Sequence, residues 1–119
     1  MLLVDAANVV GSRPTGWWRD RAGAARQLVV QVRAAVAEGK LEGPVVVVLE
    51  GAARAGVEEA DLGGVRVVHA PGAGDDTIAD LASHALEPVT LVSADRGLRA
   101  RVERSDAAAV GPHWLLDRL

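Results

Sequence analysis

Short runs of apolar residues alternate along the chain with longer segments in which apolar residues recur every three or four positions. A short, nearly continuous apolar run is typical of a strand that is buried on both faces of a sheet. We therefore expect five strands. They cover residues 2–4, 45–49, 65–69, 89–92 and 107–110, the last being the weakest.

Helical spacing fills most of the intervals between these strands. The longest helix is expected from about Trp17 to Gly39, where apolar residues repeat on one face and Gly39 and Pro44 end the pattern. Shorter helices are predicted to begin at Asp75, at Arg96 and at Pro112. Of the remaining segments, residues 9–16 are expected to form a loop and residues 52–62 a short helix or turn.

Strands that alternate with helices predict an α/β fold: a single domain over residues 1–119 with a doubly wound parallel sheet and helices on both faces. Right-handed crossovers then place the carboxyl ends of all the strands along one edge. Ligands of such sheets bind outside that edge. The chemistry of the chain is therefore expected in the segments that directly follow the strands.

Acidic residues gather at this edge of the predicted sheet. Asp5, Glu50 and Asp95 each follow a strand, and Asp75 and Asp76 open the helix after the third strand. Carboxylates at close range repel one another unless a cation lies between them. Since the chain has no cysteine, its metal ligands would be oxygen or imidazole, and carboxylates suit Mg²⁺ or Mn²⁺. Taken singly, each acid has a simpler explanation as a helix cap or a solvated strand end.

The net charge of −3 is unevenly distributed, because residues 11–40 carry six basic and two acidic side chains and the remainder carries seven and fourteen. Trp17 and Trp18 lie in this basic segment. The arginines nearest to them are Arg13, Arg19 and Arg21. A Trp stacked on an unpaired base, beside an Arg that meets a phosphate, is a common way to bind single-stranded RNA. The alternative is that one Trp anchors the long helix in the core and the other makes a contact in a homodimer.

Other chemistries find less support in the residues. The glycine-rich segment 72–76 lacks the Lys-Ser/Thr ending of a triphosphate-binding loop, and its glycine spacing does not fit a dinucleotide site. No zinc-type pair of histidines and no convincing Ser-His-Asp set is present. The apolar runs are too short for a membrane span, and Asp5 interrupts the first of them, so we expect a soluble cytoplasmic protein with no membrane partner.

Four segments carry a recognisable pattern in order along the chain. Residues 3–10 read Leu-Val-Asp-Ala-Ala-Asn-Val-Val, residues 46–51 end in Glu-Gly, residues 74–78 read Gly-Asp-Asp-Thr-Ile, and residues 89–96 end in Ser-Ala-Asp-Arg. Together they resemble the NYN branch of the PIN-like nuclease superfamily, most closely the YacP-like RNase domains, over essentially the whole chain. The sequence departs from that family at Ala6-Ala7, where Gly-Tyr is usual, at Gly74, where Ala is usual, and at Glu50, where Asp is commoner.

This resemblance implies a three-layer PIN-like sheet of about five strands in the order 3-2-1-4-5. It also implies a Mg²⁺- or Mn²⁺-dependent endoribonuclease that hydrolyses RNA phosphodiesters. Asp5, Asp75 and Asp95 would be the main ion-binding acids, with Asp76 a further metal ligand and Glu50 in support. Asn8 and Ser93 would orient a water, an acid or a phosphate.

The expected partner is single-stranded RNA, with ribosome-associated RNA as one form of it. The side chains expected to bind this RNA are Arg13, Trp17, Trp18, Arg19, Arg21 and Arg96. Two other functions stay open at this point. One is a non-catalytic RNA-binding or toxin-like regulatory module that keeps the acids without turnover. The other is a hydrolase of nucleotides or other small phosphate esters.

Overall fold

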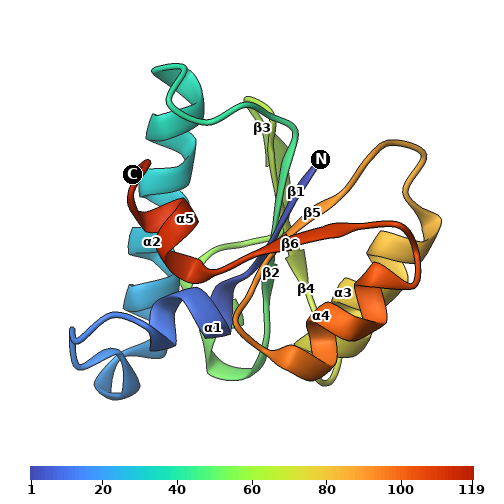
Figure 1. The fold of residues 1–119 in the computed structure, drawn as a ribbon. Coiled ribbons are helices and arrows are strands. Elements are labelled where there is room, and N and C mark those ends of the chain that lie inside the picture. Colours follow the sequence, from blue (N-terminus) through green and yellow to red (C-terminus); the bar gives the residue numbers. More distant parts are fainter.

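The computed structural model describes every residue from Met1 to Leu119 and shows a six-stranded sheet between two layers of helices (Figure 1). The order of the strands across the sheet is β3-β4-β2-β1-β5-β6. Five strands run parallel, and β3 alone pairs antiparallel, with β4. The strands are β1 (Leu2–Asp5), β2 (Val45–Leu49), β3 (Ala60–Leu62), β4 (Val65–His69), β5 (Thr90–Val92) and β6 (Ala108–Val110).

Five α-helices and two 3₁₀ segments connect the strands. The α-helices are α1 (Ala6–Gly11), α2 (Arg21–Ala37), α3 (Gly74–His84), α4 (Arg96–Glu103) and α5 (Pro112–Leu116), and the 3₁₀ segments are η1 (Trp17–Arg19) and η2 (Gly51–Gly56). Helices α1, α2 and α5 cover one face of the sheet, and α3 and α4 cover the other (Figure 1). None of these helices combines the length and the apolar character needed to span a bilayer.

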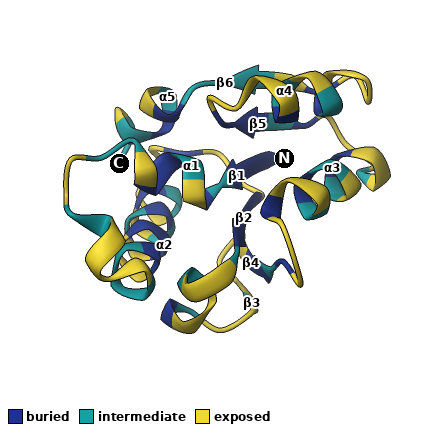
Figure 2. Ribbon diagram, turned by 90° about the horizontal axis from the view of Figure 1, so that it is seen from below, coloured by how far each residue is buried: buried dark blue, intermediate teal, exposed yellow.

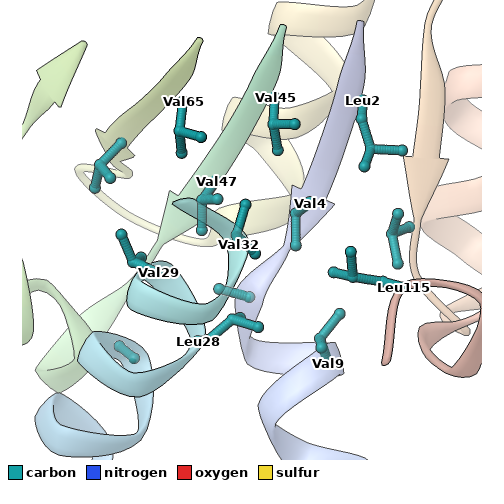
Figure 3. Packing of buried hydrophobic residues seen from close by; sticks show 14 of the residues in the cluster. Leu2, Val4, Val9, Leu28, Val29, Val32, Val45, Val47, Val65 and Leu115 are labelled. Atoms are coloured by element: carbon teal, nitrogen blue, oxygen red, sulfur yellow. The ribbon is translucent and has the colours of Figure 1, made fainter. Parts of the chain in front are cut away.

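Alternation along the strands divides the apolar side chains between two cores. On β1, Leu2 and Val4 belong to the core beneath α1, α2 and α5, and Leu3 belongs to the core beneath α3 and α4. This period of two is inherent to a strand, and it explains why β2, which is covered on both faces, is apolar at every position. The first core is the larger, with 18 buried residues (Figure 3). In Figure 2 the central strands β1, β2 and β5 are largely dark blue and the outer surfaces of the helices are largely yellow, so the middle of the sheet is covered from both sides.

The predicted fold class is confirmed, and the predicted order of the five parallel strands is the order observed for β4-β2-β1-β5-β6. The sixth strand was missed. Residues 52–62, expected as a short helix or turn, form η2 followed by β3, which turns back onto β4 through Gly63 and Gly64. Both glycines have positive φ angles, 59° and 81°, which suit a tight hairpin connection. Strand β3 has only three residues, Ala-Asp-Leu, of which Asp61 and Leu62 are exposed. Its sequence therefore shows no apolar run that would predict a strand.

Two further expectations were wrong near the amino terminus. A loop was expected over residues 9–16, but residues 6–11 form α1. This helix forms because Asp5 caps it and because Val9 and Val10 pack into the larger core. The expected helix from Trp17 is divided: η1 ends at Arg19, and α2 begins at Arg21, with Asp20 between them. The carboxylate of Asp20 accepts a hydrogen bond of 2.8 Å from the backbone N–H of Gly23, so it caps a new helix at that point.

Candidate functional site

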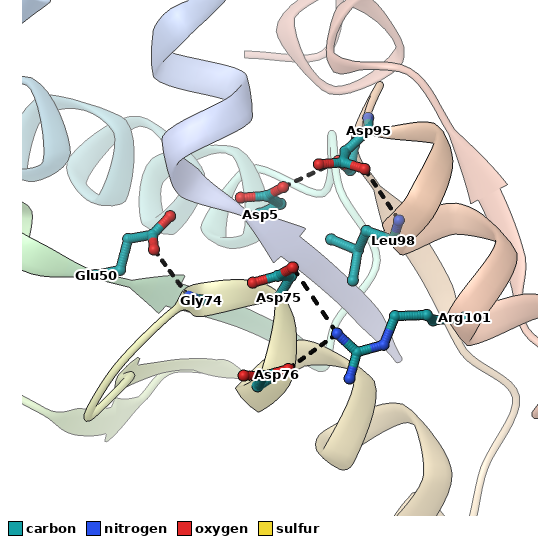
Figure 4. Close-up of polar contacts among 9 residues, drawn as sticks. Asp5, Glu50, Gly74, Asp75, Asp76, Asp95, Leu98 and Arg101 are labelled. Atoms are coloured by element: carbon teal, nitrogen blue, oxygen red, sulfur yellow. Dashed lines mark hydrogen bonds and ion pairs between the residues drawn. The ribbon is translucent and has the colours of Figure 1, made fainter.

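A pocket of about 310 Å³ opens at the carboxyl edge of the central strands. Its wall is polar except for Ala7, and four of its residues are acidic. They come from separate segments: Asp5 ends β1, Glu50 follows β2, Asp75 lies in the first turn of α3, and Asp95 precedes α4. Figure 4 shows these carboxylates facing a common space. Asn8 of α1 completes the lining. We refer to this space as the acidic pocket.

Asp5 is partly buried, whereas Asp75 and Asp95 are exposed. Burial raises the pKa of the Asp5 carboxyl group above the ordinary value. Hydrogen bonds from the Ser93 hydroxyl (2.9 Å) and the Asn8 backbone N–H (3.4 Å) lower that pKa, and the negative charges of Glu50 and Asp95 raise it. The net effect is upward, so the charged form of Asp5 is held at a cost in free energy. A cation in the pocket would remove part of that cost.

Ser93 and Asn8 fasten the end of β1 to the loop that follows β5. Ser93 is fully buried; its Oγ donates to Asp5 Oδ2 and accepts a hydrogen bond of 3.1 Å from the Asp95 N–H. The Asn8 side-chain oxygen accepts a hydrogen bond of 2.7 Å from the Ala94 N–H. Asp95 itself caps α4, since its Oδ1 accepts from the Leu98 N–H at 3.0 Å. These bonds fix Asp5 and Asp95 relative to each other across two neighbouring strands.

Glu50 holds the beginning of α3. Its Oε2 accepts a hydrogen bond of 2.8 Å from the Gly74 N–H, which no side chain within α3 satisfies. Gly74 is buried against this carboxylate: a Cβ added to it would lie 3.1 Å from the Glu50 side chain. This close packing explains why position 74 is a glycine, since any larger side chain would crowd Glu50. Through this contact, Glu50 sets the position of the turn that carries Asp75.

Asp75 and Asp76 both pair with Arg101, but their side chains point to different places. Arg101 of α4 lies 3.8 Å from Asp75 Oδ2 and 3.0 Å from Asp76 Oδ1 (Figure 4). Asp75 lines the acidic pocket, whereas Asp76 does not, and the side chain of Asp76 is 75% exposed. The structure therefore does not bring Asp76 to the other acids. Sequence reasoning missed Arg101, because no local pattern shows that α4 packs beside α3.

The donor set fits a hard divalent cation in kind, since every polar side chain of the acidic pocket offers oxygen. The spacing of these side chains suits an ion that is held by few direct protein ligands. No three His, Asp or Glu side chains lie together closely enough to form the ligands of a single ion. Magnesium commonly takes one or two direct carboxylates and keeps its other ligands as water, which is the arrangement this pocket can offer. Asp5, Asp75 and Asp95 are the residues from which those one or two direct ligands would come.

The basic residues expected to bind RNA are not all free. Arg13 donates a hydrogen bond of 2.9 Å to the Gln31 side chain of α2, and partial burial lowers the pKa of its guanidinium. Arg21 lies over the Trp17 ring with 5.3 Å between its Cζ and the ring centroid. Arg19 lies over the Trp18 ring in the same way, at 5.9 Å. Arg96 is exposed beside Asp95.

The two tryptophans differ in their surroundings. Their rings meet edge to face at 5.9 Å and 87°. Trp17 packs partly against the larger core, as one of the two anticipated roles requires, whereas Trp18 is 57% exposed. Trp17 therefore anchors the segment before α2. Trp18 is on the surface.

The strand order, with acids at the strand ends, is that of a PIN-like α/β fold, which this chain shares with a YacP structure. The crystal structure of a mutant of Rae1 (YacP) from Bacillus subtilis superposes on it with a TM-score of 0.71. The two share 20% sequence identity over 98% of this chain and 72% of that chain, and a likeness of this degree establishes the fold. No protein-family model and no curated protein sequence matches the chain.

Proposed function

We propose that this protein is an endoribonuclease that hydrolyses RNA phosphodiesters with a divalent cation held at the acidic pocket. One observation carries the proposal: four carboxylates from distant segments line a single pocket at the strand ends of a YacP-like fold. Ligands of doubly wound sheets bind at that edge. The resemblance of the sequence to the YacP-like RNase domains supplies the reaction and the substrate class.

When bound, the cation supplies Lewis-acid chemistry: it acidifies water and stabilises negative charge on the phosphate. The chain's own residues prepare its place. Ser93 directs one oxygen of Asp5 through its hydrogen bond, and burial leaves the Asp5 charge poorly solvated, so a cation beside it would stabilise that charge. Asn8 holds the loop that carries Asp95. Glu50 fixes the first turn of α3, and with it Asp75.

The direct test is cleavage of a single-stranded oligoribonucleotide with Mg²⁺, with Mn²⁺ and with EDTA. We expect cleavage with either ion and none with EDTA. Asp5→Asn and Asp95→Asn should each reduce the rate at least about 100-fold, in the range measured when one electrostatic contact to a transition state is lost. Asp61→Asn is the matched control, because this substitution makes the same change of charge at a residue that is exposed on the edge strand β3.

Full activity in folded Asp5→Asn and Asp95→Asn would refute the proposed roles. Binding of the oligonucleotide without cleavage under any of the three conditions would identify an RNA-binding module instead. Hydrolysis of nucleoside triphosphates with no cleavage of the oligonucleotide would identify a small phosphate-ester hydrolase.

A further inference from the structure

A second pocket, of about 490 Å³, adjoins the acidic pocket on the face covered by α1 and α2. The two pockets share Ala7 and Glu50 in their walls. A ligand that lies across Ala7 therefore occupies both. The volume is within the range of pockets that bind small organic groups.

The second pocket is mainly apolar, unlike its neighbour. Its wall consists of Val10, the indole of Trp17 and small residues, of which Ala53 is the one that η2 presents with a half-buried side chain. Small side chains leave room for a flat group beside the indole. An aromatic side chain in such a wall is a surface on which a nucleobase can stack.

Two charged side chains, Arg21 and Glu50, also line the second pocket, and they match the two ends of a nucleotide. Arg21 offers a positive charge beside Trp17, suited to a phosphate. Glu50 offers an acceptor: Gly74 bonds to its Oε2, and no group of the protein donates to its Oε1. A carboxylate in this position favours a base edge that carries N–H donors. Guanine presents two such donors side by side, whereas uracil presents a single N–H between two carbonyl groups.

We propose that this second pocket holds one unpaired base of the RNA, next to the phosphate at the acidic pocket, and that Glu50 makes it prefer guanine to uracil. The inference rests on the proposed function, because it takes the ligand to be RNA. It assigns the base contact to Trp17. Trp18 lies outside the pocket wall.

Nucleoside 5′-monophosphates in EDTA separate base binding from cleavage. We expect GMP to shift the amide NMR signals of η2 and the indole signal of Trp17, with a dissociation constant in the millimolar range or below, and ribose 5-phosphate to leave these signals unmoved. UMP should bind several-fold more weakly than GMP. Glu50→Gln should reduce that difference, while its amide oxygen can still accept the Gly74 N–H.

Matched variants locate the contact. Ala53→Leu narrows the pocket and should weaken GMP binding about 10-fold or more, whereas Ala52→Leu, on the exposed side of the same η2 segment, should not. Trp17→Leu should weaken binding about 10-fold, equal to about 1.4 kcal/mol and within the range for loss of one base stack. Trp18→Leu should leave it unchanged. Melting temperatures recorded for each variant distinguish lost binding from unfolding.

The results separate this inference from the proposed function. Absence of GMP binding, or equal binding by Ala53→Leu and wild-type protein, would overturn the second pocket as a base site, even where the oligonucleotide is cleaved normally. GMP binding with the predicted pattern, in a protein that cleaves no RNA, would uphold the base site and overturn the nuclease.

Discussion

Replacing Ser93 by alanine tests whether the buried hydroxyl stabilises the charge of Asp5. Ser93 is fully buried, and its hydroxyl donates to Asp5 Oδ2 at 2.9 Å. A hydrogen bond to a charged group is worth roughly 1.5–3 kcal/mol, and a neutral one roughly 0.5–1.5 kcal/mol. We therefore expect Ser93→Ala to lower the free energy of unfolding by about 2 kcal/mol at pH 7. For a domain of this size that is a fall in melting temperature of about 8 °C.

The pH dependence of this loss has a definite sign. The pKa of Asp5 in the folded protein lies above its unfolded value, so the folded state binds more protons between the two values and stability falls as the pH rises through that window. In Ser93→Ala the hydrogen bond that lowers the pKa is gone, so the window extends to higher pH. The difference in stability between the two proteins should be smallest in acid and largest at neutral pH.

The assay is a double-mutant cycle of Ser93→Ala, Asp5→Asn and the double variant, measured by denaturant unfolding without metal. Because Asn keeps an acceptor but not the charge, the cycle isolates the charged part of the bond, and the coupling should be about 1 kcal/mol at pH 7. At a pH where Asp5 is protonated in the parent protein the coupling should approach zero. A coupling within about 0.3 kcal/mol of zero at pH 7 would refute the reasoning.

Two other variants probe the scaffold of the site. Gly56→Ala should destabilise the protein by about 3 kcal/mol or more in thermal unfolding, because its Cβ would overlap the backbone carbonyl of Ala22 in α2, whereas Gly72→Ala, with open space around it, should be neutral; equal melting temperatures would contradict this. Arg101→Gln should change stability by less than about 1 kcal/mol, because its ion pairs are solvent-exposed. The same variant should bind Mn²⁺ more tightly, since a competing cation beside Asp75 is removed; unchanged or weaker Mn²⁺ binding would contradict that role.

Much of the fold could be predicted because the strong signals were local. Val45–Leu49 and Val65–His69 begin and end where the apolar pattern predicted. The elements that were missed depend on contacts the pattern cannot show. Helix α1 forms because Asp5 caps it and two valines reach the core, and β3 is held by its pairing with β4.

The sequence predicts where the candidate site lies better than it predicts how the side chains of the site are arranged. Topology alone brings Asp5, Asp75 and Asp95 to one edge, and the structure places them around one pocket. The separate direction of Asp76 and its pairing with Arg101 follow from the packing of α3 beside α4, which no spacing in the sequence reports. The second pocket is not predictable from the sequence for the same reason, because its wall joins residues of α1, η1, α2 and η2.

The most direct measurement is Mn²⁺ binding to the metal-free protein, followed by electron paramagnetic resonance. We predict that the wild-type protein binds Mn²⁺ and that Asp5→Asn and Asp75→Asn each weaken the binding at least about 10-fold, as expected for loss of a ligand or of a group that supports one. Asp61→Asn makes the same change of charge at a residue outside the acidic pocket, and it should bind Mn²⁺ as the wild type does. Equal Mn²⁺ affinities in all four proteins would contradict the account, because the acids at the strand ends would then not hold the ion together.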